Sequence, residues 1–384
     1  MSTRADQLPS LAPTTRQGRQ GTSGGGSYIV VVSPSYGGAE KRFFDIFRSL
    51  RAQGEKVCLI APSSLTRRLL DDHPDEPGLA EAVIAVPQDE WRPLDFIRKY
   101  RQLLATLPRR SSFHYPLNCL WPLHVGRGDR VTLSVADCVH TPGPTLSNRV
   151  GFWTWLSFFA VDRVDVLSPA ILANMQAYRM ARKMSLTPGG TFIEVPAASS
   201  SARRPEVALV SRLVELKGID DLLDVLPAVW QRLDGHVPPD FGFRIAGYGA
   251  LQDHVTKRIT ALAKSGVPVE FIGYADAKSL FPSVSIALSM QEATNYPSRV
   301  VAEALSSGCG VIVRDTGDSR QFGTLPGLLY CAAELDADEL ADKISSLVGM
   351  IATNPTFSSQ VREAALDRFS GRASVDYFQR MLHP

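Results

Sequence analysis

The sequence predicts two α/β domains, each with a parallel sheet flanked by helices. Strand and helix patterns alternate from residue 28 to residue 167, a segment of turn and linker composition follows, and the alternation restarts at residue 207. The chain has 384 residues, of which 44% are hydrophobic, so it is long enough to fill two cores. These observations favour two domains joined by a short linker.

In the first half, short apolar runs alternate with longer amphipathic runs. The expected strands are Tyr28–Ser33, Lys56–Ala61, Val83–Val86, Val131–Val135 and Val164–Leu167. The expected helices are Ala39–Gln53, Asp95–Leu107 and Trp153–Ala160. Residues 1–26 are polar and rich in glycine and serine, so we expect a disordered tail there and a first domain over 27–186.

The second half repeats the pattern after a linker expected at 187–204, which contains Thr187-Pro188-Gly189-Gly190 and a run of serines. The expected strands are Val207–Val210, Phe243–Ala246, Val269–Ile272, Ile286–Leu288 and Gly310–Val313. The expected helices are Ile219–Trp230, Gln252–Lys264 and Ser298–Ser307. We therefore expect a second domain over 205–365, and a C-terminal helical segment over 366–384 that crosses back to the first domain.

Composition argues against several classes of protein. The 41 basic and 39 acidic side chains nearly balance, so the overall field gives no reason to expect a nucleic-acid partner. The five cysteines are scattered without metal-ligand spacing, which is typical of free thiols in a reducing compartment. No apolar run has membrane-spanning length, and the N-terminus lacks a signal-peptide core. A cytoplasmic protein is the resulting expectation.

Two basic side chains follow the first strand of the second domain. Arg212 and Lys217 lie five positions apart in the loop before the helix Ile219–Trp230. Open parallel sheets bind ligands at the carboxyl ends of their strands, and two cations there suit a diphosphate. On their own, two solvated charges at a helix start would be the simpler interpretation.

Two further features point to the same chemistry. Gly37 and Gly38 follow the first strand, where the missing Cβ atoms allow a phosphate to approach backbone N–H groups at a helix start. An ordinary tight turn explains the glycines equally well on their own. Glu303 lies among apolar neighbours, and an unpaired buried carboxylate would be costly, so we favour a binding role for it.

Taken in chain order, these motifs resemble glycosyltransferase family four, which are retaining enzymes of the GT-B fold. The resemblance also rests on Ile245–Gly249, Val269–Gly273 and Asn295–Gly308, covers most of residues 28–380, and is most specific in the second domain. It implies two doubly wound, Rossmann-like domains that face each other across a cleft.

The resemblance also implies roles for individual residues. Arg212 and Lys217 would hold the diphosphate of a nucleoside-diphosphate sugar and stabilise its charge as the glycosidic bond breaks, and Glu303 would accept the ribose hydroxyls. With two cations at the diphosphate, no metal and no other cofactor are expected. The implied reaction transfers the sugar with retention to a saccharide or lipid-linked glycan acceptor in glycan or polysaccharide biosynthesis.

The chain departs from the family pattern at one donor position. Asn295 occupies the place of the family's first glutamate, eight residues before Glu303. Its amide can hydrogen-bond a sugar hydroxyl but carries no negative charge. Ser298 and Arg299 then become candidate donor contacts at the start of the following helix. The substitution keeps open the alternative of a catalytically silent GT-B scaffold in a glycan-assembly complex.

The acceptor side is less well marked. The family often has a His-Asp pair after the central strand of the first domain, and here Asp137 is the candidate for the aspartate while the histidine is missing. His140 and His114 are the other acceptor-side candidates. A basic cluster raises the separate question of peripheral contact with the inner face of a membrane. It consists of Arg92, Arg98, Lys99, Arg101, Arg109 and Arg110.

Overall fold

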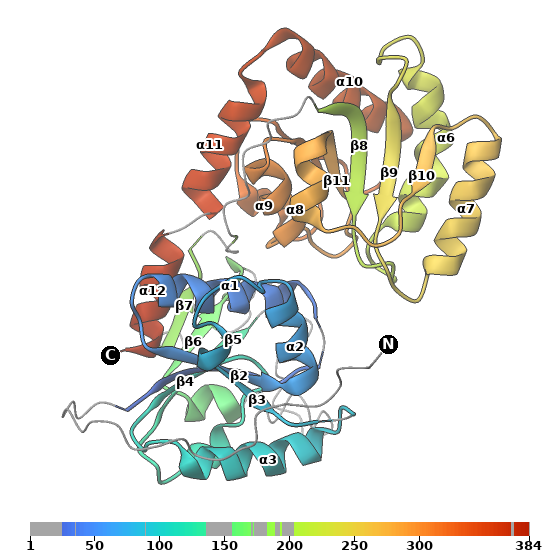
Figure 1. Ribbon diagram of the computed structural model, residues 1–384. Helices are drawn as coiled ribbons and strands as arrows, with labels where there is room; N and C mark the ends of the chain where they lie inside the picture. The colour runs from blue at the N-terminus through green and yellow to red at the C-terminus, as the bar shows by residue number, and fades with distance from the viewer. Residues whose placement is uncertain are drawn as a thin grey trace.

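A computed structural model describes residues 25–34, 36–88, 90–135, 156–169, 172, 183–188, 193, 203–369 and 372–383. The chain forms two domains, each built on one parallel sheet (Figure 1). The prediction of two doubly wound α/β domains is confirmed. Most of the expected tail and linker, and the first part of the expected helix Trp153–Ala160, lie outside the described residues.

The first sheet has seven strands in the order β3-β2-β1-β4-β5-β6-β7. They are β1 (Ser27–Val31), β2 (Val57–Pro62), β3 (Val83–Val86), β4 (Ser112–Leu117), β5 (Arg130–Val135), β6 (Arg163–Val166) and β7 (Met184–Leu186). Along β1 the side chains alternate between two cores, Tyr28 and Val30 packing on one face and Ile29 and Val31 on the other. Both faces are therefore covered, as parallel sheets require.

Among the described residues, the first domain contains the helices α1 (Gly38–Ala52), α2 (Ser63–Asp71) and α3 (Pro93–Thr106), a helical stretch over 156–160, and short 3₁₀ turns at Ala80–Ala82 and Trp121–His124. Tyr28 stacks on Phe113 across the β1–β4 pair, with ring centroids 4.8 Å apart. This contact places β4 at the centre of the sheet, next to β1.

The second sheet has six strands in the order β10-β9-β8-β11-β12-β13. They are β8 (Arg204–Val210), β9 (Gly242–Ala246), β10 (Val269–Phe271), β11 (Val284–Ser289), β12 (Gly310–Arg314) and β13 (Leu328–Cys331). The helices are α6 (Ile219–Leu233), α7 (Gln252–Lys264), α8 (Ala277–Leu280), α9 (Arg299–Ser306), α10 (Ala337–Thr353) and α11 (Phe357–Phe369), with 3₁₀ turns at Phe281–Ser283 and Ser319–Phe322.

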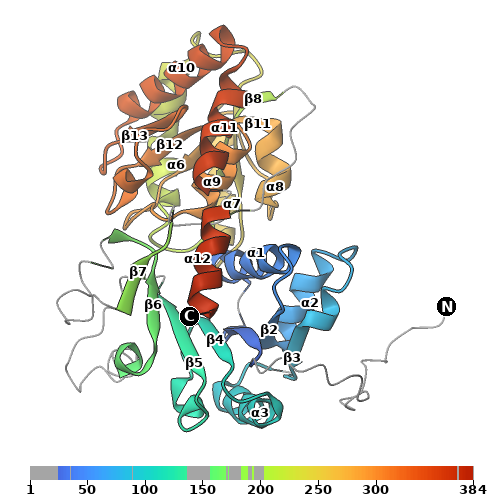
Figure 2. The ribbon, with the colours of Figure 1, turned by 90° about the vertical axis from the view of Figure 1, so that its left-hand side faces the viewer.

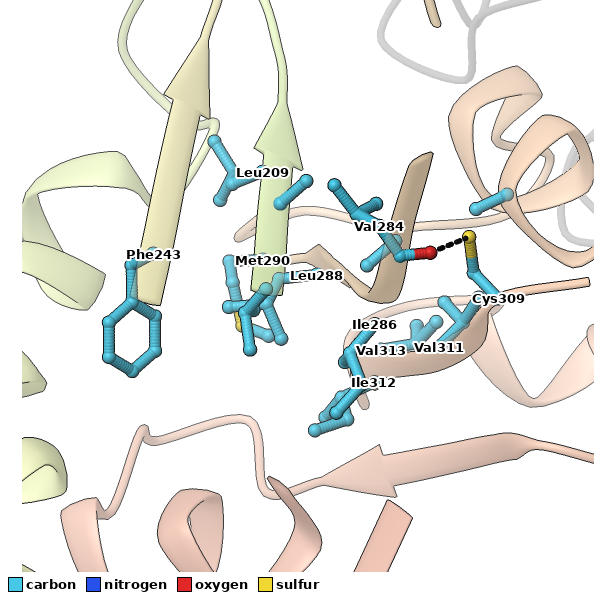
Figure 3. Packing of buried hydrophobic residues seen from close by; sticks show 14 of the residues in the cluster. Leu209, Phe243, Val284, Ile286, Leu288, Met290, Cys309, Val311, Ile312 and Val313 are labelled. Carbon is cyan, nitrogen blue, oxygen red and sulfur yellow. Dashed lines mark hydrogen bonds between the residues drawn. The ribbon is translucent and has the colours of Figure 1, made fainter. Parts of the chain in front are cut away.

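The core of the second domain is a single apolar cluster. Side chains of neighbouring strands pack closely in it, among them Leu209 of β8, Leu288 of β11 and Ile312 of β12 (Figure 3). The buried thiol of Cys309 donates to the carbonyl oxygen of Val284 at 3.5 Å. This core fixes the strand ends on which the candidate site is built.

The last helix belongs spatially to the first domain. α12 (Arg372–Leu382) lies beside α1 (Figure 2). Its Phe378 meets the ring of Phe43 of α1 edge-on at 5.6 Å. Val375 and Met381 join the same apolar cluster, so the C-terminal segment ties the second domain to the first.

Candidate functional site

The candidate site lies where the strands of the second sheet end. β8 is flanked by β9 on one side and β11 on the other, so the chain reverses its direction of winding between β8 and β11. Ligands bind open α/β sheets at such a switch point, beyond the carboxyl ends of the strands. The loop 211–218 follows β8, the loop 290–298 follows β11, and these strand ends lie on the side nearer the first domain (Figure 1).

Glycines let the loops at this edge pack closely. A Cβ on Gly218, whose φ is +66°, would lie 1.8 Å from the carbonyl oxygen of Met290. A Cβ on Gly247 would lie 1.9 Å from that of Ser211, and one on Gly249 2.3 Å from that of Leu213. Leu213 N–H also donates to Tyr248 O at 2.8 Å. These close contacts hold the loops after β8, β9 and β11 together as one packed unit.

The two predicted cations lie on this unit. Arg212 is exposed, and its guanidinium makes no hydrogen bond or ion pair with the described residues. Lys217 is half-buried, and its Nζ donates to Oε1 of Gln291 from the neighbouring loop. Arg212 is thus open to a ligand, while Lys217 is oriented by its contact with the neighbouring loop.

Glu303 lies in the middle of α9 and is nearly buried. Its Oε1 accepts from Nε of Arg299 at 2.6 Å, one helical turn earlier. Nη2 of Arg299 lies 2.6 Å from Oδ2 of Asp45, which belongs to α1 of the first domain. The predicted donor residues Arg299 and Glu303 are therefore brought together, with an acidic partner that the sequence analysis did not identify.

The prediction that Asn295 contacts the donor is wrong. Its side chain is 1% exposed and faces into the domain. Oδ1 accepts from Ser289 Oγ at 2.7 Å, and Nδ2 donates to the carbonyl oxygen of Arg314 at 2.7 Å. Because both ends of the amide are used between the β11 and β12 loops, Asn295 holds these loops together and has no group left for a sugar.

Ser298 caps α9. Its buried hydroxyl accepts from the N–H of Val301 at 3.4 Å, and the preceding peptide bond, Tyr296–Pro297, is cis. The cap uses one lone pair of the hydroxyl, and the predicted donor contact of Ser298 stays a prediction.

The start of α1 differs from the expected phosphate cradle. The N–H of Gly37 donates to Oε2 of Glu40 at 3.0 Å, and Ser33 Oγ donates to the other carboxylate oxygen at 2.8 Å. The N–H of Gly37 is thus already bonded to a carboxylate of its own helix, as in a capping box, and the contact of Gly37 with a phosphate stays a prediction. Gly38 is exposed, and a Cβ there would meet no described atom within 4 Å. Its predicted role stays open.

The structure describes only one of the three acceptor-side candidates. Asp137 and His140 lie outside the described residues. His114 lies within β4 and is fully buried, with Nδ1 2.9 Å from Thr132 Oγ1 and Nε2 3.0 Å from Ser134 Oγ. The prediction that it faces an acceptor is wrong, because both ring nitrogens are bound inside the first domain.

The burial of His114 makes a prediction about acid stability. Burial and the charge of Arg42 lower the pKa of His114 to about 3, whereas an unfolded histidine titrates near 6.5. The unfolded chain therefore takes up a proton here before the folded chain does. We expect a stability on the order of a few kcal/mol, fully present above pH 6.5, to be lost as the pH falls toward 3.

The measurement is the free energy of unfolding of the wild type and of His114→Gln between pH 7 and pH 4. Glutamine retains donor and acceptor groups but does not titrate, so the variant is expected to lose less stability on acidification. His236→Gln, at an exposed histidine, is the matched control. Parallel pH curves for the wild type and His114→Gln would contradict the assignment.

Two exposed tyrosines at the same edge were missed by the sequence analysis. Tyr248 follows β9 and Tyr274 follows β10, with ring centroids 5.8 Å apart and exposures of 46% and 61%. Burial raises the pKa of Tyr274, and the charges of Asp276, Asp72 and Glu303 raise it further. Tyr274 thus lies near Asp72 of the first domain as well as Glu303. The sequence signal that could have identified these tyrosines is an aromatic residue directly after a glycine in each loop.

The described part of the chain holds no group of three histidine, cysteine or acidic residues that could bind a metal ion. Asp336 and Asp338 lie close together at the start of α10 but have other partners: Asp336 caps the helix by accepting from Glu339 N–H at 2.8 Å, and Asp338 lies 2.5 Å from Arg232. No helix in the described ranges is long and apolar enough to cross a membrane.

Of the basic cluster, three members are paired with nearby carboxylates: Arg92 lies 3.1 Å from Glu90, and Arg98 and Lys99 share Asp95 of α3. Asp95 lies 2.6 Å from Arg98 and 2.8 Å from Lys99. The remaining cations are exposed, and peripheral membrane contact stays a prediction.

Comparisons with known proteins agree with this architecture. Residues 204–349 match the family model described as "Glycosyl transferases group 1". The structure of Anabaena Alr3699/HepE in complex with UDP is similar over 93% of this chain and 99% of that chain, with a TM-score of 0.71 and 18% identity. The fold is GT-B.

Two further structures resemble the chain over most of its length. The UDP-glucose complex of Anabaena Alr3699/HepE has a TM-score of 0.69 at 18% identity and covers 92% of this chain and 98% of that one. A glycosyltransferase from Rickettsia africae ESF-5 has a TM-score of 0.66 at 14% identity and covers 93% and 98%. No curated protein sequence matches the chain. The GT-B arrangement of the two domains therefore extends over nearly the whole chain.

Proposed function

We propose that the chain is a retaining glycosyltransferase that moves a sugar from a nucleoside-diphosphate sugar to a saccharide or lipid-linked glycan acceptor. The observation that carries the proposal is the position of Arg212 and Lys217 at the β8/β11 switch point, on the side of the sheet that faces the first domain. The match of residues 204–349 to the glycosyl transferases group 1 model supports it. Because similar structures hold UDP or UDP-glucose, a uridine nucleotide is the first donor to test.

In the proposed mechanism the two cations act on the departing diphosphate. The bond between the sugar's anomeric carbon and the phosphate oxygen breaks, and negative charge grows on the diphosphate. Arg212 and Lys217 stabilise that charge without a metal ion. The acceptor hydroxyl attacks from the same face, and its proton passes to the departing phosphate oxygen, so the configuration is retained. Glu303 contributes by accepting the ribose hydroxyls.

The proposal is tested by incubating the protein with UDP-glucose, GDP-mannose and ADP-glucose without an acceptor and following the slow hydrolysis by ¹H NMR. A retaining enzyme releases the sugar first as the donor's own α anomer. Release of the β anomer first would show inversion instead. No cleavage of any donor, with or without added glycans, would favour the scaffold alternative, in which the departure at Asn295 reflects a lost activity.

A further inference from the structure

Arg299 joins the two domains through two carboxylates. Its guanidinium lies 2.6 Å from Asp45 of α1 and 2.6 Å from Glu303 of α9. All three side chains are nearly buried, with exposures of 11% for Arg299, 4% for Asp45 and 11% for Glu303. A surface ion pair would contribute little, but burial makes each partner depend strongly on the others.

The charges explain why the guanidinium stays in place. Burial by itself lowers the pKa of Arg299, but the attraction of Glu303 and Asp45 outweighs it and holds the pKa above its ordinary value. Two carboxylates thus share one cation. Nη1 of Arg299 and Oδ2 of Asp45 are both buried and make no hydrogen bond with the described residues, so the 2.6 Å contact between Asp45 and Arg299 is an ion pair and the guanidinium keeps an unused donor.

Arg42 of α1 is a second cation near Asp45, but it does not take the place of Arg299. Arg42 is buried and lies 3.4 Å from Thr187 Oγ1 through Nη2, with its guanidinium against Phe43 at 4.9 Å from the ring centroid. It is therefore held within the first domain, next to the buried Asp165. Asp45 is therefore paired with Arg299 of the second domain and not with Arg42 of its own helix.

From this geometry we propose that Arg299 is a positioning residue that makes nucleotide binding at Glu303 depend on Asp45 of the first domain. The inference rests on the proposed function, because it takes the ribose of the donor as the ligand of Glu303. While Asp45 holds one side of the guanidinium, Arg299 engages one oxygen of Glu303 and leaves the other for the ribose. Without Asp45, Arg299 turns both of its donor edges to Glu303 and competes with the ribose.

The coupling must act in both directions. If Asp45 strengthens nucleotide binding by some factor, the bound nucleotide strengthens the contact between the domains by the same factor. The donor thereby favours the arrangement in which the two domains meet at Asp45 and Arg299. This gives a physical route from occupancy of the donor site to the placement of the acceptor domain.

The test is Asp45→Asn in the full-length protein, with the affinities for UDP and for inorganic pyrophosphate measured by calorimetry. UDP carries a ribose and pyrophosphate does not, so only UDP uses Glu303. We expect UDP affinity to fall roughly five- to tenfold, the lower part of the usual range for coupled sites. Pyrophosphate affinity is expected to stay within about twofold. Asp338→Asn, which breaks the Arg232 pair within the second domain, is the matched control.

Repeating the Asp45→Asn substitution in the Glu303→Gln variant separates a positioning role of Asp45 from a purely structural one. In Glu303→Gln the ribose has lost its charged acceptor, so adding Asp45→Asn is expected to have no further effect on UDP affinity. An equal loss in both backgrounds, or an equal loss of UDP and pyrophosphate, would overturn the inference and leave Asp45 a structural residue. Unchanged UDP binding in Asp45→Asn would overturn it as well.

A different result would refute the proposed function itself. If the wild type binds neither UDP nor any other nucleoside diphosphate, the proposed function is wrong and the inference falls with it.

Discussion

Replacing Lys217 with alanine is expected to lower the rate of sugar transfer by about 100-fold or more. The ammonium group lies at the carboxyl end of β8, where a diphosphate would gain charge in the transition state. Its contact with the side chain of Gln291 orients it at the edge of the sheet where the ligand is expected. The rate is measured under saturating donor with the acceptor that supports the fastest turnover.

Lys264→Ala is the matched control for this prediction. Lys264 is an exposed lysine at the end of α7 in the same domain, so its removal makes the same change in net charge. We expect the control to keep full activity and Lys217→Ala to keep a wild-type melting temperature. Activity of Lys217→Ala within a few fold of wild type would remove the residue from the mechanism.

Replacing Gly218 with alanine is expected to destabilise the second domain by roughly 2–5 kcal/mol. Two costs add at this position. The backbone has φ +66°, which is unfavourable for alanine, and the new Cβ would lie 1.8 Å from the carbonyl oxygen of Met290. Because the obstacle is backbone, the loops after β8 and β11 must move apart. Thermal unfolding should show a fall in melting temperature of about 5–15 °C.

Gly235 offers a control at the other end of the same helix. Its φ is +76°, but a Cβ there would meet no described atom within 4 Å. Gly235→Ala therefore bears the backbone cost alone, about 1 kcal/mol. Equal melting temperatures for the two variants would contradict the view that Gly218 is required by the close approach of the two loops.

Most elements in which hydrophobic residues recur at a regular spacing could be predicted from the sequence. The strand Val83–Val86 and the helix Gln252–Lys264 end at the expected residues. β4 was missed, although it is the central neighbour of β1, because His114 and Pro116 interrupt its apolar pattern. The structure accepts the histidine there by binding both ring nitrogens to hydroxyls of β5. Such pairing across strands leaves no local signal.

The candidate site was predicted unevenly for a related reason. The loops that carry Arg212 and Lys217 follow from strand order, which alternation along the chain reveals. The direction in which a side chain points does not. Asn295 faces inward because hydroxyl and carbonyl groups from two other segments meet it, and the N–H of Gly37 is taken by Glu40. Asp45 was overlooked since its partner Arg299 lies 254 positions away in the other domain.

The central claim is that the second domain binds the diphosphate of a nucleotide sugar through the loop after β8. The most direct test is a thermal-shift titration of the wild type and Lys217→Ala with UDP, GDP and ADP, each with EDTA or with magnesium. The account predicts that one nucleotide raises the melting temperature of the wild type equally with and without magnesium, and that Lys217→Ala loses most of this shift. No shift of the wild type with any nucleotide at millimolar concentration, or an equal shift in Lys217→Ala, would contradict it.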